Sequence, residues 1–183
     1  MNKRYLIIKG SGRENGYTNR LCSELVEYLK GNEVEIFDTH NEHIIPCNGC
    51  DYCRFSGVCI NRDLDAFYKS FEECDTVIFL TPVYNGTFPA PMKSLIDRFQ
   101  VYYSSFYENN KIQPIEKRRT AYLIGAAGRD GNVAFEYMKG QLKCAFTILN
   151  VELKDAFLCS NTDTQPDFEG VLQQIKRSLS IND

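Results

Sequence analysis

Residues 5–19 read YLIIKGSGRENGYTN. An apolar run at 5–9 is followed at once by a turn that contains three glycines, and an amphipathic helical pattern begins at Asn19. A short apolar strand that passes through a glycine-rich turn into a helix is typical of a sheet whose strands run parallel. This stretch therefore predicts an α/β fold in which strands and helices alternate.

The rest of the chain repeats this alternation. Further strands are predicted at 34–38, 76–80, 121–125 and 151–157, and helices at 19–30, 64–73, 91–103, 133–146 and 168–179. Five strands alternating with five helices predict a parallel sheet in the order 2-1-3-4-5, with helices on both faces. No repeat or linker interrupts the pattern, so we expect one domain over residues 1–183.

Composition narrows the classes of function. The chain has 183 residues, a hydrophobic fraction of 43% and a formal net charge of -3. The length fits one α/β domain, and the hydrophobic fraction is enough to bury a core, which excludes disorder as the main state. A slightly acidic chain has no long-range field that would collect a polyanion. We therefore expect small-molecule ligands and no nucleic-acid partner.

The N-terminal region and the cysteines bear on location. No stretch approaches the length of a membrane span, and the apolar run at 5–9 is a strand rather than an export signal. We expect a cytoplasmic protein with no membrane partner. In that compartment the eight cysteines are expected to be thiols or metal ligands rather than a disulfide scaffold.

The loop after the first strand has the parts of a phosphate site. Ligands of open parallel sheets bind beyond the carboxyl ends of the strands where the strand order reverses, here at strands one and three. After strand one, Ser11 and Thr18 supply hydroxyls and Arg13 supplies a charge, beside the positive end of a helix. The glycine spacing GxGxxxG does not match the dinucleotide motif, and no P-loop triplet is present. The alternative is a plain turn with Thr18 as a helix cap.

The loops after strands three and four can approach a flat ring. Residues 81–86 read TPVYNG, in which Tyr84 offers an aromatic face and Asn-Gly can turn sharply. Residues 125–131 read GAAGRDG, where small side chains permit close backbone approach. Each loop has a plain surface turn as its alternative. In the helix that follows strand three, Lys93, Asp97 and Arg98 are expected on a helix surface or a subunit contact.

Four cysteines are concentrated in the irregular segment 40–62. Cys47, Cys50, Cys53 and Cys59 follow a C-x₂-C-x₂-C-x₅-C pattern, and thiolates are the usual ligands of iron-sulfur clusters. Zinc, with or without His40 and His43, metal-free thiols and an adventitious disulfide are the alternatives. We expect both histidines on the surface, without a catalytic role. The scattered cysteines are expected to be buried small residues: Cys22, Cys74, Cys144 and Cys159.

Together these loops resemble the NADPH-dependent FMN reductase and iron-sulfur flavoprotein branch of the flavodoxin-like superfamily. The residues that carry the resemblance are Gly10-Ser11-x-Arg13-x-x-Gly16-x-Thr18, Pro82-x-Tyr84-x-Gly86, Pro91-Met92-Lys93 and Asp97-Arg98. The resemblance implies a flavodoxin-like fold and FMN as cofactor. It implies that Ser11, Arg13, Thr18 and Asn19 hold the FMN phosphate and that Pro82, Val83, Tyr84, Asn85 and Gly86 hold the ring, with help from Ala127 and Gly128. Gly16 and Tyr17 are further candidates for FMN binding, and Arg129 is a candidate contact of an anionic part of the flavin or the nicotinamide nucleotide, with a surface turn as its alternative.

The resemblance also implies the chemistry. Such proteins take a hydride from NAD(P)H onto FMN and pass electrons to an acceptor, here unidentified, with no catalytic acid, base or nucleophile from the protein. They commonly form homodimers, so residues 101–107 are expected either at that interface or in a local core. The cysteine spacing resembles the motif that carries a four-iron cluster in iron-sulfur flavoproteins. A flavin-free metal-binding or regulatory module on the same fold is the alternative from another class.

Overall fold

Five parallel strands form one sheet in the computed structural model, which describes residues 2–108 and 110–180. The strands are β1 (Arg4–Lys9), β2 (Glu33–Asp38), β3 (Thr76–Pro82), β4 (Arg119–Ala126) and β5 (Val151–Cys159). Their order in the sheet is β2-β1-β3-β4-β5, and every neighbouring pair is parallel. The predicted flavodoxin-like order is confirmed.

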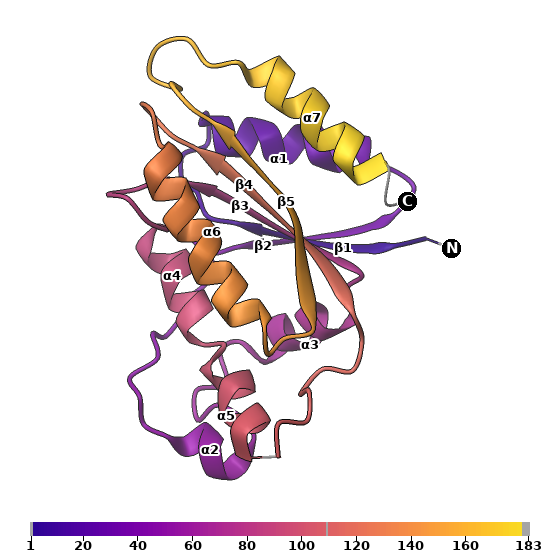
Figure 1. The fold of residues 1–183 in the computed structure, drawn as a ribbon, viewed down its shortest axis with the longest axis vertical. Helices are drawn as coiled ribbons and strands as arrows, with labels where there is room; N and C mark the ends of the chain where they lie inside the picture. The colour runs from indigo at the N-terminus through magenta and orange to yellow at the C-terminus, as the bar shows by residue number, and fades with distance from the viewer. Residues whose placement is uncertain (1, 109, 181–183) are drawn as a thin grey trace.

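Helices cover both faces of the sheet, as predicted (Figure 1). Helices α1 (Tyr17–Tyr28) and α7 (Phe168–Ser180) lie on one face, and α3 (Asp65–Glu73), α4 (Ala90–Asp97) and α6 (Asn132–Phe146) lie on the other. Amphipathic helices bury their apolar stripe against the sheet, so each face has its own hydrophobic core. Within the described residues, no helix has the length and apolar character that a membrane crossing requires.

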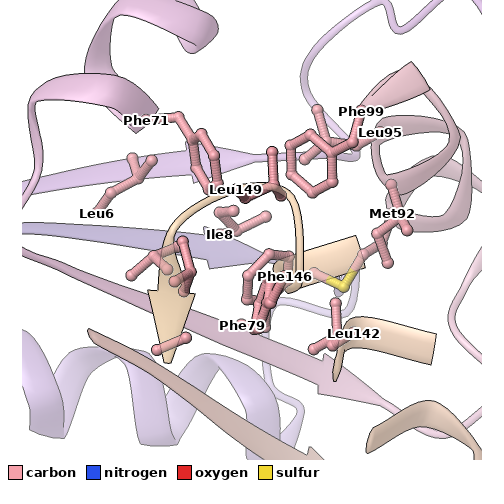
Figure 2. Packing of buried hydrophobic residues seen from close by; sticks show 14 of the residues in the cluster. Leu6, Ile8, Phe71, Phe79, Met92, Leu95, Phe99, Leu142, Phe146 and Leu149 are labelled. Atoms are coloured by element: carbon pink, nitrogen blue, oxygen red, sulfur yellow. The ribbon is translucent and has the colours of Figure 1, made fainter. Parts of the chain in front are cut away.

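The larger core lies under α3, α4 and α6. Figure 2 shows Phe71, Phe79, Phe99 and Phe146 packed with Met92 and several leucines against the sheet. Every residue of β3 is buried, as expected for the central strand of a parallel sheet. This core holds β1 and β3 in place relative to one another. The positions at which the following loops leave the sheet are therefore fixed as well.

The helix predicted at 91–103 is two helices, α4 and α5 (Gln100–Glu108). They are separated at Arg98 and Phe99, whose side chains are only 1% and 3% exposed. The expectation that Arg98 lies on a helix surface or a subunit contact is therefore wrong. Its guanidinium points inward to the carboxylate of Asp63, and the Phe99 ring points into the core. The helix is therefore interrupted at these two residues.

The cysteine segment contains a short helix that the sequence did not predict. Helix α2 (Tyr52–Ser56) is flanked by two residues in the left-handed region, Asp51 at φ 58° and Gly57 at φ 71°. It packs against α5, and Figure 1 places both helices beyond the body of the sheet, next to α4. Outside α2 the segment has no regular secondary structure, as expected.

Two further expectations concern exposure. Cys22, Cys74 and Cys159 are buried as expected, but Cys144 is exposed because it lies on the outer side of α6. In the aromatic segment 101–107, Tyr102 is buried in the larger core, whereas Tyr103 and Tyr107 are exposed. The segment therefore contributes to a local core and also presents an aromatic surface.

Candidate active site

A cavity of about 490 Å³ opens beyond the carboxyl ends of β1, β3 and β4. Its lining comes from the loops after these strands and from the loop after β5. Nine of the residues selected from the sequence line it: Ser11, Arg13, Gly16, Tyr17, Thr18, Pro82, Val83, Tyr84 and Gly128. The structure therefore brings together residues from three separate loops at the point where the strand order reverses.

The first loop is shaped by its own backbone hydrogen bonds. Gly10 N–H donates to the Leu80 carbonyl at 2.8 Å, so the loop leaves the sheet from a position fixed by β3. Gly16 N–H donates to the Arg13 carbonyl at 3.1 Å, and Arg13 N–H donates to the Ser11 hydroxyl at 3.3 Å. Ser11 and Thr18 are each 2% exposed, whereas Arg13 is exposed. The result is a turn with two buried hydroxyls and one exposed cation, at the start of α1.

The Asn19 side chain stabilises this loop through hydrogen bonds to its backbone. Its side-chain amide donates to the carbonyls of Arg13 at 2.8 Å and Glu14 at 3.2 Å. It does not line the cavity, so the structure places it as a support of the loop rather than among the lining residues. Thr18 lies inside α1, and the helix has Gly16 at its N-cap with no side-chain cap. The simple capping role for Thr18 is therefore wrong.

The second loop is a tight turn. Tyr84 and Thr87 exchange two backbone hydrogen bonds of 2.9 Å each, with Asn85 at φ 48° and Gly86 at φ 81° between them. Two consecutive residues with positive φ are typical of a type I′ turn, which Asn-Gly forms readily. Asn85 and Gly86 thus hold Tyr84 at the cavity wall and do not themselves line it.

Four lining residues were not predicted from the sequence: Asn15, Ala126, Thr162 and Asp163. The last two reach the cavity because the loops after β4 and β5 pair with each other. Thr162 N–H donates to the Ala127 carbonyl at 2.9 Å, and Asp163 N–H donates to the Gly128 carbonyl at 3.0 Å. Ala127 and Arg129 serve this pairing through their backbones, and neither lines the cavity. The run TQPD after Asp163 gave no motif that could have identified it.

The four clustered cysteines line a second cavity of about 300 Å³. Cys47 and Cys50 are exposed, Cys59 is partly buried, and Cys53 is buried. The Cys53 Sγ lies 3.5 Å from the Ser104 hydroxyl and 4.0 Å from the Gln100 carbonyl, both on α5. All eight cysteines are free thiols. His40 and His43 are exposed, as expected.

The four cysteines differ in how well they suit a single metal ion and a cluster. In the described part of the chain, no three His, Cys, Asp or Glu side chains are grouped so as to hold a metal ion. A single tetrahedral ion would need its four sulfurs within a few ångströms of one another, since Zn–S bonds are only about 2.3 Å long. A cluster spreads the same four thiolates around a larger body. The four cysteines that line this cavity supply the thiolate donor type of iron-sulfur clusters.

Comparisons with known proteins identify the family of the chain. A family model described as NADPH-dependent FMN reductase matches residues 4–139, well over half of the chain. The chain belongs to the NADPH-dependent FMN reductase family.

Relatives of this FMN reductase family member include iron-sulfur flavoproteins. It is 34% identical over 94 residues to one from Methanosarcina thermophila, which covers 50% of this chain and 49% of that protein. It is 34% identical over 108 residues to one from Methanocaldococcus jannaschii, which covers 57% of this chain and 56% of that protein. The chain thus spans about half the length of both relatives.

The fold of this FMN reductase family member also occurs in solved structures. The NAD(P)H:quinone oxidoreductase from Methanothermobacter marburgensis superposes with a TM-score of 0.74 at 16% identity, covering 97% of this chain and 94% of that chain. At this identity the likeness shows the flavodoxin-like fold.

Proposed function

We propose that this protein is an FMN-dependent oxidoreductase that passes electrons from NAD(P)H to an acceptor. The observation that carries the proposal is the cavity that joins a glycine-rich turn at the start of α1 to Pro82, Tyr84 and Gly128. A buried-hydroxyl turn with a nearby cation suits a phosphate monoester, and the aromatic and glycine end suits a flat ring. When bound there, FMN would supply the redox chemistry by accepting a hydride from the nicotinamide.

The residues of the chain bind and orient the cofactor. Ser11, Arg13 and Thr18 would hold the phosphate, Tyr84 would contact the ring, and the Gly128 backbone permits close approach at its edge. Asp163 would meet a polar edge of the ring, because it lines the same cavity as Gly128 and any side chain at position 128 would collide with its carboxylate. No proton transfer by a side chain is required, so the geometry of stacking is what the protein supplies.

A second role is favoured by the cysteine cavity. We propose that Cys47, Cys50, Cys53 and Cys59 hold a four-iron cluster that exchanges single electrons with FMN. The support is that all four cysteines line one cavity and that the relatives are named iron-sulfur flavoproteins. The protein would then act as an electron carrier whose acceptor is unidentified, and a homodimer is the assembly that we propose for it.

The test is the visible spectrum of protein purified without oxygen, with iron and sulfide assays. Flavin bands that NADH or NADPH bleaches, overlaid by a broad shoulder with about four irons per chain, are expected. Flavin bands without iron would leave the reductase and exclude the cluster. Apoprotein that fails to bind FMN at micromolar concentrations would contradict the first proposal and favour a flavin-free module.

Arg13→Ala is expected to weaken FMN binding by roughly tenfold to a hundredfold, because a hydrogen bond to a charged group contributes about 1.5–3 kcal/mol. Fluorescence titration of apoprotein with FMN measures the effect. Arg118→Ala is the matched control, since Arg118 is exposed, pairs with Glu152 and lies outside the cavity. Equal affinities for wild type and Arg13→Ala would remove Arg13 from the phosphate site.

Asn19→Ala is expected to weaken FMN binding by a smaller factor, about threefold to tenfold, through the loop rather than by a lost contact. The change removes both side-chain hydrogen bonds to the carbonyls of Arg13 and Glu14. Titration with riboflavin, which lacks the phosphate, shows whether the weaker binding depends on the phosphate and therefore on this loop. A variant with an unchanged affinity for FMN would show that the loop holds its shape without Asn19.

A further inference from the structure

Arg98 is a buried arginine that the proposed flavin chemistry does not use. It is the C-cap residue of α4, is 1% exposed, and lines the cysteine cavity but not the FMN cavity. A buried charge is costly unless it is paired and hydrogen-bonded. The question is therefore what the buried guanidinium does at this place.

The guanidinium joins the two ends of the cysteine segment. One terminal nitrogen donates to the Ile45 carbonyl at 2.6 Å, and the other donates to the Asn61 carbonyl at 2.9 Å. Ile45 lies just before Cys47, and Asn61 lies just after Cys59. A single side chain thus fixes the entry and the exit of the segment that carries all four thiols.

Asp63 completes this connection. Its carboxylate accepts from both terminal nitrogens of Arg98, at 2.9 and 3.1 Å, and also from the Ile45 N–H at 2.9 Å. The Asp63 side chain is 13% exposed. Partial burial alone would raise the pKa of Asp63, but the hydrogen bonds from Arg98 and the Ile45 N–H outweigh it and hold the pKa below its ordinary value. Asp63 is thus ionised at neutral pH and compensates the buried cation.

One donor of Arg98 remains free. Its Nε is buried and has no hydrogen-bond partner among the described residues. Four thiolates and a cluster would bring net negative charge into the cavity that Arg98 lines. A buried cation with an unused N–H is a suitable neighbour for such a group.

We propose that Arg98, held by Asp63, is the positioning residue of the cysteine cavity. Its planar guanidinium links Ile45 to Asn61 through two hydrogen bonds, and this link keeps the segment between them folded so that the four cysteines line one cavity. The idea that the thiols then bind a cluster rests on the proposed function, whereas the positioning role of Arg98 does not depend on it. A lysine cannot replace the guanidinium, because its single ammonium does not reproduce the planar set of bonds to two carbonyls and a carboxylate.

The experiment compares wild type with Arg98→Lys, Arg98→Gln and Asp63→Asn. Arg62→Lys is the matched control, because Arg62 borders the same segment but is exposed and pairs only locally with Asp65. The first readout is the alkylation rate of Cys53 by iodoacetamide in protein without iron, followed by peptide mass mapping. The second is iron and sulfide per chain after anaerobic reconstitution. FMN titration reports whether each variant is folded.

The Arg98 variants are expected to raise the Cys53 alkylation rate by at least about tenfold, since breaking a buried pair favours local opening. Iron content should fall to less than about half of the wild-type value, with FMN affinity unchanged, and Arg98→Lys should not rescue either readout. Asp63→Asn, which keeps the shape of the side chain, should shift both readouts in the same direction. Arg62→Lys should match wild type.

Three other outcomes would contradict parts of this proposal. Wild-type protection of Cys53 in both Arg98→Lys and Arg98→Gln would overturn the positioning role. If an Arg98 variant loses FMN binding and does not fold, Asp63→Asn carries the test, and wild-type alkylation in that variant would overturn the proposal. A wild-type protein that takes up no iron would refute the cluster, while the alkylation rates would still decide the role of Arg98.

Discussion

Cys53→Ser is expected to abolish the iron-sulfur cluster that we propose, while FMN still binds with unchanged affinity. Cys53 is the buried member of the four thiols, and its sulfur lies beside the Ser104 hydroxyl on α5. Serine keeps the size of the side chain but replaces a thiolate ligand with a hydroxyl, which is a poor ligand for iron in such clusters. Iron and sulfide per chain, measured on protein prepared without oxygen, should fall to background.

Cys144→Ser is the matched control for this prediction. Cys144 is an exposed thiol on α6, outside the cysteine cavity, so its replacement should leave iron and flavin unchanged. Retention of the cluster by Cys53→Ser would exclude Cys53 as a ligand. Loss of FMN together with iron would show that the two cavities are structurally coupled, although they share no lining residue.

Phe71→Ala is expected to lower the free energy of unfolding by about 3–5 kcal/mol, the range for removing a buried phenylalanine. The Phe71 side chain is fully buried, with ring centroids 5.0 Å from Phe99 and 5.6 Å from Phe67. The Arg119 guanidinium lies 4.6 Å from the centroid of the same ring. Figure 2 shows Phe71 within the larger core, so its loss leaves a cavity among groups that cannot easily close it.

Urea unfolding followed by circular dichroism measures this loss. Phe55→Ala is the matched control, because Phe55 is 85% exposed on α2 and the substitution removes the same side-chain atoms from the surface. Its effect should stay below about 0.5 kcal/mol. A loss of less than 1 kcal/mol in Phe71→Ala would mean that the core relaxes around the site, contrary to the close packing seen here.

The order of elements could be predicted from the sequence because each strand is a short apolar run between turn residues. The centres of all five strands were found, and the structure extends several of them by a few residues. The break between α4 and α5 could not be found, since Arg98 continues a charge pattern with Lys93 and Asp97 that is typical of an exposed face. The partners that turn Arg98 inward, which are the Asp63 carboxylate and the carbonyls of Ile45 and Asn61, are all distant in sequence.

The site residues that could be predicted best are those next to the carboxyl end of a strand. Ser11 and Arg13 follow β1, Pro82 ends β3 and Tyr84 follows it, at the point where the strand order reverses. Asp163 follows β5 and reaches the cavity only through backbone hydrogen bonds between two loops, which no side-chain pattern reveals. Helix α2 has only five residues, too few for hydrophobic periodicity to be recognised.

The link from Arg98 to Ile45 and Asn61 has a consequence for sequence variation. Both acceptors are backbone carbonyls, which every amino acid provides, so the side chains at these two positions are free to change without loss of the bonds. The chain between them is held at both ends by one arginine and along its length by the packing of α2 against α5. Changes of sequence between residues 45 and 61 that keep the two carbonyl bonds and this packing are therefore expected to leave the sheet unchanged.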